Sequence, residues 1–136
     1  MYLKDWNVYL VNTETVPPVI HLCRKIPFAL HDKLKQELDR MEKAEVICKV
    51  EQSSTWVSSI VLSIKKNGAL RVCLDPRNLN KAIKREHFKL PSREEVMSQF
   101  KDAKYFSKID ASSGFWQMKL DKTSSMYTCF NTPLER

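Results

Sequence analysis

The sequence predicts an α+β fold in which an extended N-terminal arm, residues 1–27, leads into one domain, residues 28–136. Three observations support this class: an amphipathic helical pattern over residues 30–43, an Asn-Gly hairpin signal, and several strand-like segments after residue 100. Three prolines keep the arm extended. At 136 residues and 43% apolar content, the chain is long enough to bury one modest core.

The first regular element is expected to be a helix over residues 30–43. Four apolar residues recur there at helical spacing, while charged and polar side chains fill the other face. These four are Leu30, Leu34, Leu38 and Met41. The pattern indicates a helix that packs one apolar stripe against a core, and a short β-prone stretch at residues 46–50 follows it.

A β-hairpin is expected next, with strands over residues 56–65 and 69–74. Asn67 and Gly68 lie between the two strand-like runs, and both residue types tolerate the positive φ that a tight hairpin turn requires. The hairpin would carry basic residues at its tip and on its returning strand. One or two helical turns are expected over residues 76–83.

The second half of the chain is expected to hold one short helix and three short strands. Ser92 and Glu95 have the spacing of a capping box, which predicts a helix from Ser92 to near Phe100. Residues 104–110, 116–120 and 126–130 are rich in aromatic and β-branched side chains, so we expect strands there.

Positive charge is concentrated in residues 61–90. The whole chain has a net charge of +7, and this stretch alone carries eight basic residues against Asp75 and Glu86. Concentrated cations can neutralise a nucleic-acid backbone, and release of its counterions drives binding. The alternative is a solvated basic surface with no ligand.

Two other classes are not favoured. No apolar run approaches the roughly 20 residues that span a bilayer, and the N-terminus lacks the pattern of a signal peptide, so we expect an intracellular protein that is neither membrane-bound nor secreted. The four cysteines form no C-x-x-C pair, which favours buried, reduced thiols over a zinc site.

Asp110 is the leading candidate for chemistry. It lies where a predicted strand becomes a small-residue turn, and an exposed carboxylate there could bind Mg²⁺. The alternative is an aspartate that caps the following backbone amides. Lys65, Lys66 and Arg71 could close over a triphosphate, although a basic hairpin tip can also serve solubility alone. Phe115 could press against a sugar ring or belong to the core.

These patterns occur together in one known family. From about Pro18 to Pro133 the chain resembles the start of a reverse transcriptase, an RNA-directed DNA polymerase, of the Gypsy class of long-terminal-repeat retrotransposons. The matching segments are residues 57–61, 65–68, 70–81, 87–91, 103–117 and 131–133. The resemblance implies a right-hand polymerase fold, of which this chain would hold the fingers and the first palm strands, incomplete.

The resemblance also implies roles for individual residues. Asp110 matches the first of three catalytic aspartates that bind two Mg²⁺ ions, and Ala111 matches a neighbour whose carbonyl helps to hold a metal. Lys66 and Arg71 match the fingers residues that bind the incoming triphosphate. Phe115 matches the bulky residue that excludes a ribose 2′-hydroxyl and so favours deoxynucleotides.

The template contact is implied by a second segment. Asp75 and Arg77 match the family's D-x-R-x-L-N sequence, whose arginine meets the template strand, and Pro76 stands where many relatives have an aromatic residue. The implied partners are an RNA or RNA–DNA template-primer and a deoxynucleoside triphosphate.

The implied chemistry, nucleotidyl transfer to a primer 3′-hydroxyl, needs more carboxylates than Asp110. The family's Y-x-D-D aspartate pair is expected beyond residue 136, as in a truncated reading frame or a piece of a polyprotein. We therefore expect this polypeptide alone to bind Mg²⁺ weakly and to add no nucleotide. We also expect self-association through an unpaired sheet edge.

Two other functions stay open from the sequence. One is a non-catalytic RNA- or DNA-binding remnant that uses the basic stretch 61–90, and it predicts salt-sensitive binding. The other is an interaction module built on the amphipathic helix over residues 30–43.

Overall fold

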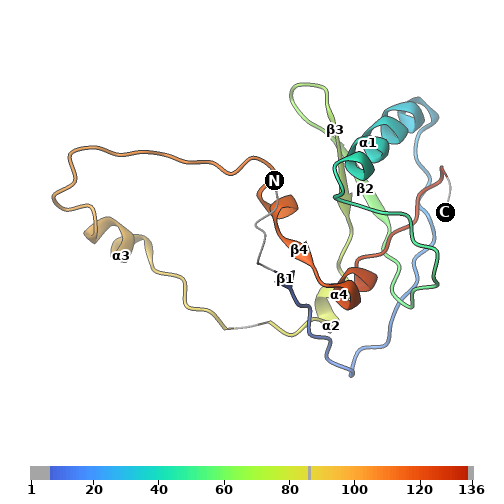
Figure 1. The fold of residues 1–136 in the computed structure, drawn as a ribbon, viewed down its shortest axis with the longest axis horizontal. Helices are drawn as coiled ribbons and strands as arrows, with labels where there is room; N and C mark the ends of the chain where they lie inside the picture. The colour runs from blue at the N-terminus through green and yellow to red at the C-terminus, as the bar shows by residue number, and fades with distance from the viewer. Residues whose placement is uncertain (1–6, 86, 135–136) are drawn as a thin grey trace.

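The computed structural model describes residues 7–85 and 87–134, and its elements lie as shown in Figure 1. The elements in order are β1 (Asn7–Val8), the 3-10 helix η1 (Phe28–Leu30), α1 (His31–Lys43), β2 (Ile60–Ile64), β3 (Leu70–Leu74), α2 (Leu79–Ala82), α3 (Arg93–Ser98), the 3-10 helix η2 (Gly114–Gln117), β4 (Lys119–Leu120) and α4 (Lys122–Tyr127). The predicted α+β class is confirmed.

The predicted hairpin is formed by β2 and β3. The two strands are antiparallel, with Ile60 opposite Leu74 and Ile64 opposite Leu70. Gly68 takes a φ of +81° in the turn, a conformation that side chains rarely adopt. The Asn67 side chain accepts a hydrogen bond of 3.2 Å from the Ala69 N–H, which supports the same turn.

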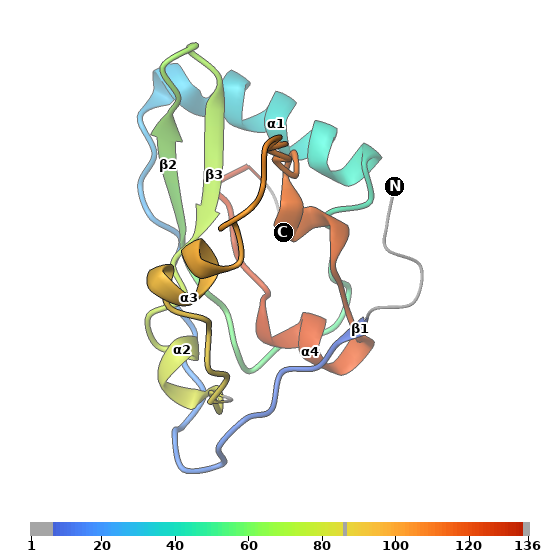
Figure 2. The same ribbon diagram turned by 90° about the vertical axis from the view of Figure 1, so that its left-hand side faces the viewer.

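Helix α1 lies across this hairpin (Figures 1 and 2), and the predicted apolar stripe faces it. Leu34 is fully buried and forms a core cluster with Ile60 and Leu70. Leu38 is half-buried against the same cluster, and Met41 is buried one turn further along. The helical spacing therefore predicted which face of α1 contacts the sheet.

The arm runs along the body and pairs with it at several points (blue in Figure 1). Strand β1 pairs in parallel with β4, and isolated bridges join Asn12 to Ile83 and Ile20 to Val57. A second core cluster, built on Trp56, Leu79 and Ala82, packs against apolar residues of the arm. Residues 1–6 of the predicted arm lie outside the described residues.

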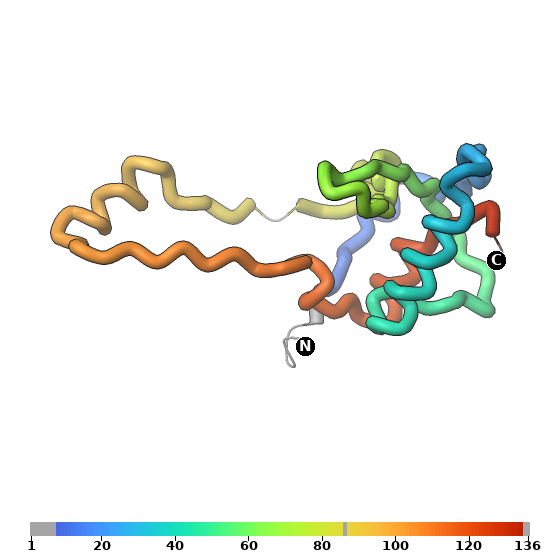
Figure 3. The backbone as a smooth tube through the Cα atoms, turned by 90° about the horizontal axis from the view of Figure 1, so that it is seen from above, coloured from blue at the N-terminus to red at the C-terminus, as the bar shows by residue number. Residues whose placement is uncertain are grey.

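Residues 84–85 and 87–112 leave the body as a long loop with α3 at its far end (Figures 1 and 3). Of the described residues in this segment, all except Val96 are exposed. The predicted capping box is present: the Ser92 hydroxyl accepts from the Glu95 N–H at 3.2 Å, and the Ser92 N–H donates to the Glu95 carboxylate at 2.7 Å. The cap begins α3 where the sequence predicted a helix.

Several predicted strands are wrong. Residues 104–110 contain no assigned strand, because no described segment pairs with them and a strand needs a partner. The β-prone stretch over residues 46–50 forms no strand either. Residues 116–120 form a strand only at Lys119–Leu120, after the 3-10 turn η2. Residues 126–130 begin inside α4 instead, because the Asp121 side chain accepts hydrogen bonds from the N–H groups of Thr123 and Ser124 and starts a helix.

Two findings bear on protein class. None of the helices in the described ranges is long and apolar enough to cross a membrane. Cys48 is exposed, and the other three cysteines are half-buried, so the prediction of buried thiols is wrong for Cys48.

Candidate functional site

The tip of the β2–β3 hairpin carries an open hollow of about 490 Å³. Its lining residues are Ser63, Ile64, Lys65, Lys66, Asn67 and Arg71. The turn at Gly68 returns the chain so that Arg71 on β3 lies opposite Ser63 on β2. Lys66 and Arg71 therefore line one exposed hollow, where both cations can approach a phosphate group from the same side.

Arg40 on α1 contacts the turn that carries Phe115. Its guanidinium donates two hydrogen bonds to the Glu37 carboxylate, at 2.8 and 2.6 Å, and lies 5.0 Å from the ring centre of Trp116. The hydrogen bond from Arg40, ahead of its charge and that of Lys65, lowers the pKa of Glu37, although partial burial opposes this. A cation–π contact of this kind joins α1 to η2, which are distant in the chain.

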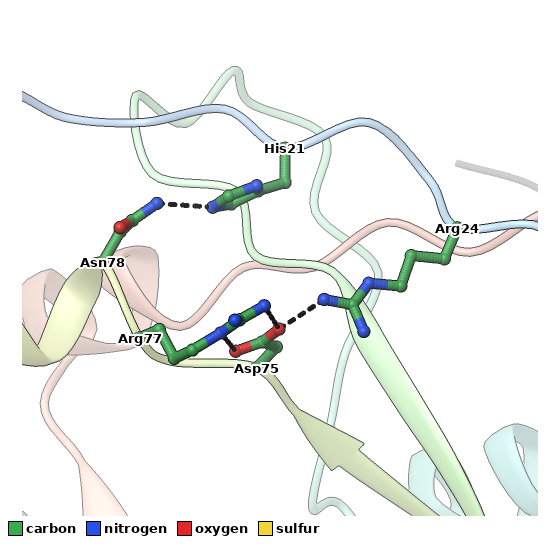
Figure 4. A network of polar contacts seen from close by, with 5 residues as sticks. All are labelled: His21, Arg24, Asp75, Arg77 and Asn78. Atoms are coloured by element: carbon green, nitrogen blue, oxygen red, sulfur yellow. Dashed lines mark hydrogen bonds and ion pairs between the residues drawn. The ribbon is translucent and has the colours of Figure 1, made fainter.

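Asp75 lies at the end of β3 between two arginines (Figure 4). Arg77 donates to both carboxylate oxygens, at 2.9 and 2.8 Å, and Arg24 donates to one of them at 2.5 Å. These contacts, chiefly the hydrogen bond from the Arg77 side chain and then its charge, lower the pKa of Asp75 to about 2. The carboxylate is therefore ionised at neutral pH and holds both guanidinium groups.

His21 fixes the part of the arm that leads to Arg24. Its N–H donates to the Val57 carbonyl at 2.8 Å, and its carbonyl accepts from the Asn131 side chain at 2.7 Å. The His21 ring and the Asn78 amide lie 2.9 Å apart, as Figure 4 shows. The arm is therefore held by hydrogen bonds to Val57, just before β2, and to Asn131, after α4.

Asp110 and Ala111 lie on the exposed limb of the loop that returns from α3. The turn predicted after Asp110 is present: Ser113 takes a left-handed φ of +51°, and its carbonyl accepts from the Trp116 N–H at 2.8 Å. Phe115 follows on η2 and is 85% exposed. The small-residue sequence therefore forms a turn that presents Phe115 to solvent.

The residues present do not make a magnesium centre by themselves. Asp110 makes no hydrogen bond or ion pair with any described residue. Across residues 7–85 and 87–134, no group of three His, Cys, Asp or Glu side chains could hold a metal ion. A lone exposed carboxylate with one carbonyl neighbour is too small a ligand set for Mg²⁺, which favours several oxygens around it.

The predicted site residues thus form two groups and one separate turn. Lys66 and Arg71 share the hairpin hollow, and Asp75 is paired with Arg77. The turn at Asp110 shares no ion pair with either group within the described part of the chain. Sequence reasoning missed Arg24 and Arg40, since no local pattern marks a contact between segments as far apart as the 51 positions that separate Arg24 from Asp75.

The comparisons with known proteins agree on one family. A model of the family described as reverse transcriptase (RNA-dependent DNA polymerase) matches residues 64–135, which is more than half of the chain. An uncharacterized protein of Caenorhabditis elegans is 32% identical over 122 residues, covering 88% of this chain. The retrovirus-related Pol polyprotein from transposon 412 of Drosophila melanogaster is 29% identical and covers 85% of this chain.

The chain spans only 10% of the length of each of these two relatives. Among solved structures, a foamy viral protease-reverse transcriptase in complex with double-stranded DNA superposes with a TM-score of 0.66 at 28% identity. That match covers 88% of this chain and 20% of the solved one, and it confirms the predicted reverse-transcriptase-like fold. The chain belongs to the reverse transcriptase family and corresponds to a part of that enzyme's domain.

Proposed function

We propose that this chain supplies the fingers and the first palm part of an RNA-directed DNA polymerase from a Gypsy-class retroelement. The observation that carries the proposal is the hairpin hollow, in which Lys66 and Arg71 lie together. In the proposal, residues 28–136 form this part of the polymerase and residues 1–27 are an arm leading into it. The similarity to a transposon Pol polyprotein supports a retroelement source.

The hairpin hollow is the proposed site for the triphosphate of a deoxynucleotide. Lys66 offers a compact ammonium charge and Arg71 a planar guanidinium, and both are exposed. Phe115, presented by the turn after Asp110, would contact the sugar and exclude a 2′-hydroxyl. Asp75 and Arg77 would contact the template strand of an RNA or RNA–DNA duplex.

Asp110 and the Ala111 carbonyl would supply one side of a Mg²⁺ site. Two divalent cations beside a single carboxylate repel each other without compensation, so the reaction needs further carboxylates that the described residues do not place there. We therefore expect no primer extension by the 136-residue polypeptide alone. The check is a template-primer extension assay with Mg²⁺. Extension by the purified chain that is lost in Asp110→Ala would contradict the expectation.

The triphosphate site is tested by nucleotide binding, which does not depend on catalysis. We expect Lys66→Ala and Arg71→Ala each to weaken binding of a fluorescent deoxynucleoside triphosphate several-fold at low salt, because each removes one cation from the hollow. The matched control is Lys101→Ala, which removes an exposed lysine from the loop outside the hollow. Equal binding by all four proteins would contradict the proposed site.

A second candidate is non-catalytic binding of RNA or DNA by the basic stretch 61–90. One observation favours it: all eight basic side chains of this stretch are exposed, whereas Asp75 is half-buried and already paired with two arginines. The cations are Lys65, Lys66, Arg71, Arg77, Lys81, Lys84, Arg85 and Lys89. Glu86, the other acid of the stretch, lies outside the described residues.

The second candidate is tested by a duplex-binding assay. The binding module requires affinity for RNA–DNA duplex that falls steeply with salt, is independent of base sequence and is reduced in Lys66→Ala or Arg71→Ala. Absence of binding at low salt would remove this candidate. We also propose that the chain self-associates, because the outer edge of β3 has no strand partner among the described residues.

A further inference from the structure

Two arginines from different parts of the chain share the Asp75 carboxylate. The Asp75 side chain is only 12% exposed, whereas the side chains of Arg24 and Arg77 are 44% and 78% exposed. Figure 4 shows the carboxylate lying between the two guanidinium groups. The two guanidinium groups therefore cover most of the carboxylate, and solvent meets mainly the two cations.

The charge of this group is not balanced internally. Two guanidinium groups and one carboxylate leave a net charge of about +1, and no other described acidic side chain pairs with either arginine. Most of the N–H groups of Arg24 and Arg77 also have no partner among the described residues. The missing complement is one anion with several acceptor oxygens, and a phosphodiester has that charge and that geometry.

The arm holds Arg24 in place before any ligand binds. The backbone of His21 is bonded to Val57 and to the Asn131 side chain, only three residues before Arg24. On the other side, Arg77 lies three residues after Leu74, the last residue of β3, and donates two hydrogen bonds to Asp75. Because both guanidiniums are already oriented, little side-chain entropy is lost when they bind an anion.

We propose that Arg24 and Arg77 together bind one backbone phosphate of a nucleic-acid strand, with Asp75 as the residue that positions them. This inference rests on the proposed function, in which Arg77 lies beside the template, and it extends that site to the N-terminal arm. Arg24 is the new member of the site.

The test measures the salt dependence of binding by the full 136-residue chain to a fluorescent RNA–DNA duplex. Each phosphate contact adds roughly 0.9 to the slope of log affinity against log salt for a duplex. We expect Arg24→Ala to lower the slope by about that amount and to weaken binding several-fold, because the remaining Arg77–Asp75 pair has no net charge to neutralise the phosphate. Arg24→Lys should restore only part of the loss. The matched control is Lys25→Ala, which removes the neighbouring exposed cation, outside the Asp75 group, and should leave the slope unchanged.

The outcomes separate this inference from the proposed function. Suppose that the wild-type chain binds, that Lys66→Ala weakens binding, and that Arg24→Ala behaves like Lys25→Ala. The Arg24 site is then wrong, while nucleic-acid binding through Lys66 at the hairpin hollow stands. If the wild-type chain does not bind the duplex at low salt, the Arg24 site fails together with the proposed template contact of Arg77, and the triphosphate site is still judged separately by nucleotide binding.

Two further measurements complete the test. Urea unfolding of Arg24→Ala shows whether a loss of binding reflects loss of the fold. Arg24→Ala that is folded and binds with an unchanged slope would overturn the site. Competition with inorganic triphosphate identifies the source of the phosphate. If triphosphate displaces the duplex equally well from the wild type and from Arg24→Ala, it binds elsewhere, and the Arg24 site is one for a backbone phosphate. If triphosphate displaces the duplex from the wild type but not from Arg24→Ala, the Arg24 site binds the phosphates of a free nucleotide, and the proposal is overturned.

Discussion

Asp75 gives the chain a pH dependence that can be assigned to one residue. Its pKa is lowered to about 2, mainly by the hydrogen bond from Arg77. An aspartate in an unfolded chain titrates near about 3.9, so the unfolded state takes up the proton first as the pH falls. The stabilising contribution of Asp75 is therefore complete above about pH 5 and is lost as the pH falls towards about 2.

The check compares urea unfolding of the wild type and Asp75→Asn across this pH range. Other acids, including Glu37 and Asp121, also have lowered pKa values, so the wild type alone would not isolate Asp75. We expect the stability difference between the two proteins to shrink between about pH 5 and pH 2. A difference that stays constant over that range would show that the Arg24 and Arg77 pairs do not form in solution.

For individual residues, the sequence predicted which site residues lie together only where a local pattern joins them. The Asn-Gly turn placed Lys66 and Arg71 on one hairpin, and the structure lines one hollow with both. Arg24 could not be predicted, because its place beside Asp75 depends on how the arm packs against β3. The position of Asp110 relative to these groups was equally beyond prediction, because a long exposed loop separates it from the hairpin.

The hairpin turn depends on glycine at one position. Gly68 has a φ of +81°, and an added Cβ would meet no atom within 4 Å, so the cost of a side chain there is backbone strain alone. We expect Gly68→Ala to lower the free energy of unfolding by about 1–2 kcal/mol. The control is Gly114→Ala, where the added Cβ would lie at an ordinary 3.5 Å from the Ala111 Cβ and no left-handed φ is required. We expect that variant to be neutral or slightly stabilising, and chemical denaturation of both measures the contrast.

Equal stability of the two glycine variants would contradict this account of the hairpin.

Elements with a local signal could be predicted from the sequence. The apolar stripe of a helix, a capping box and a tight turn each depend on residues that are close together in the chain. The prediction of a strand over residues 104–110 was wrong because β-prone side chains stabilise a strand only when it packs beside another strand. None of the described segments pairs with these residues. The missed helix α4 had a local signal, Asp121 as its N-cap.

On the scale of the whole molecule, the long loop over residues 84–112 exposes much apolar surface. Phe88, Tyr105 and Ile109 are 81%, 94% and 91% exposed. Large exposed apolar groups of this kind favour association, and the unpaired edge of β3 offers backbone hydrogen bonds as well. Repulsion from the net charge of +7 opposes association and is screened by salt.

We therefore expect the chain to self-associate, and to do so more strongly as salt is raised, because screening weakens repulsion while apolar contacts persist. Sedimentation velocity at low and high salt measures this. The double variant Phe88→Glu with Tyr105→Glu should shift the population towards monomer. A control is Leu22→Glu, which places one such charge on an 87% exposed apolar position of the arm and should change association less than Phe88→Glu alone or Tyr105→Glu alone. A wild-type chain that sediments as a monomer at both salt concentrations, with a cooperative unfolding transition, would mean that the loop and the β3 edge are covered within a single molecule.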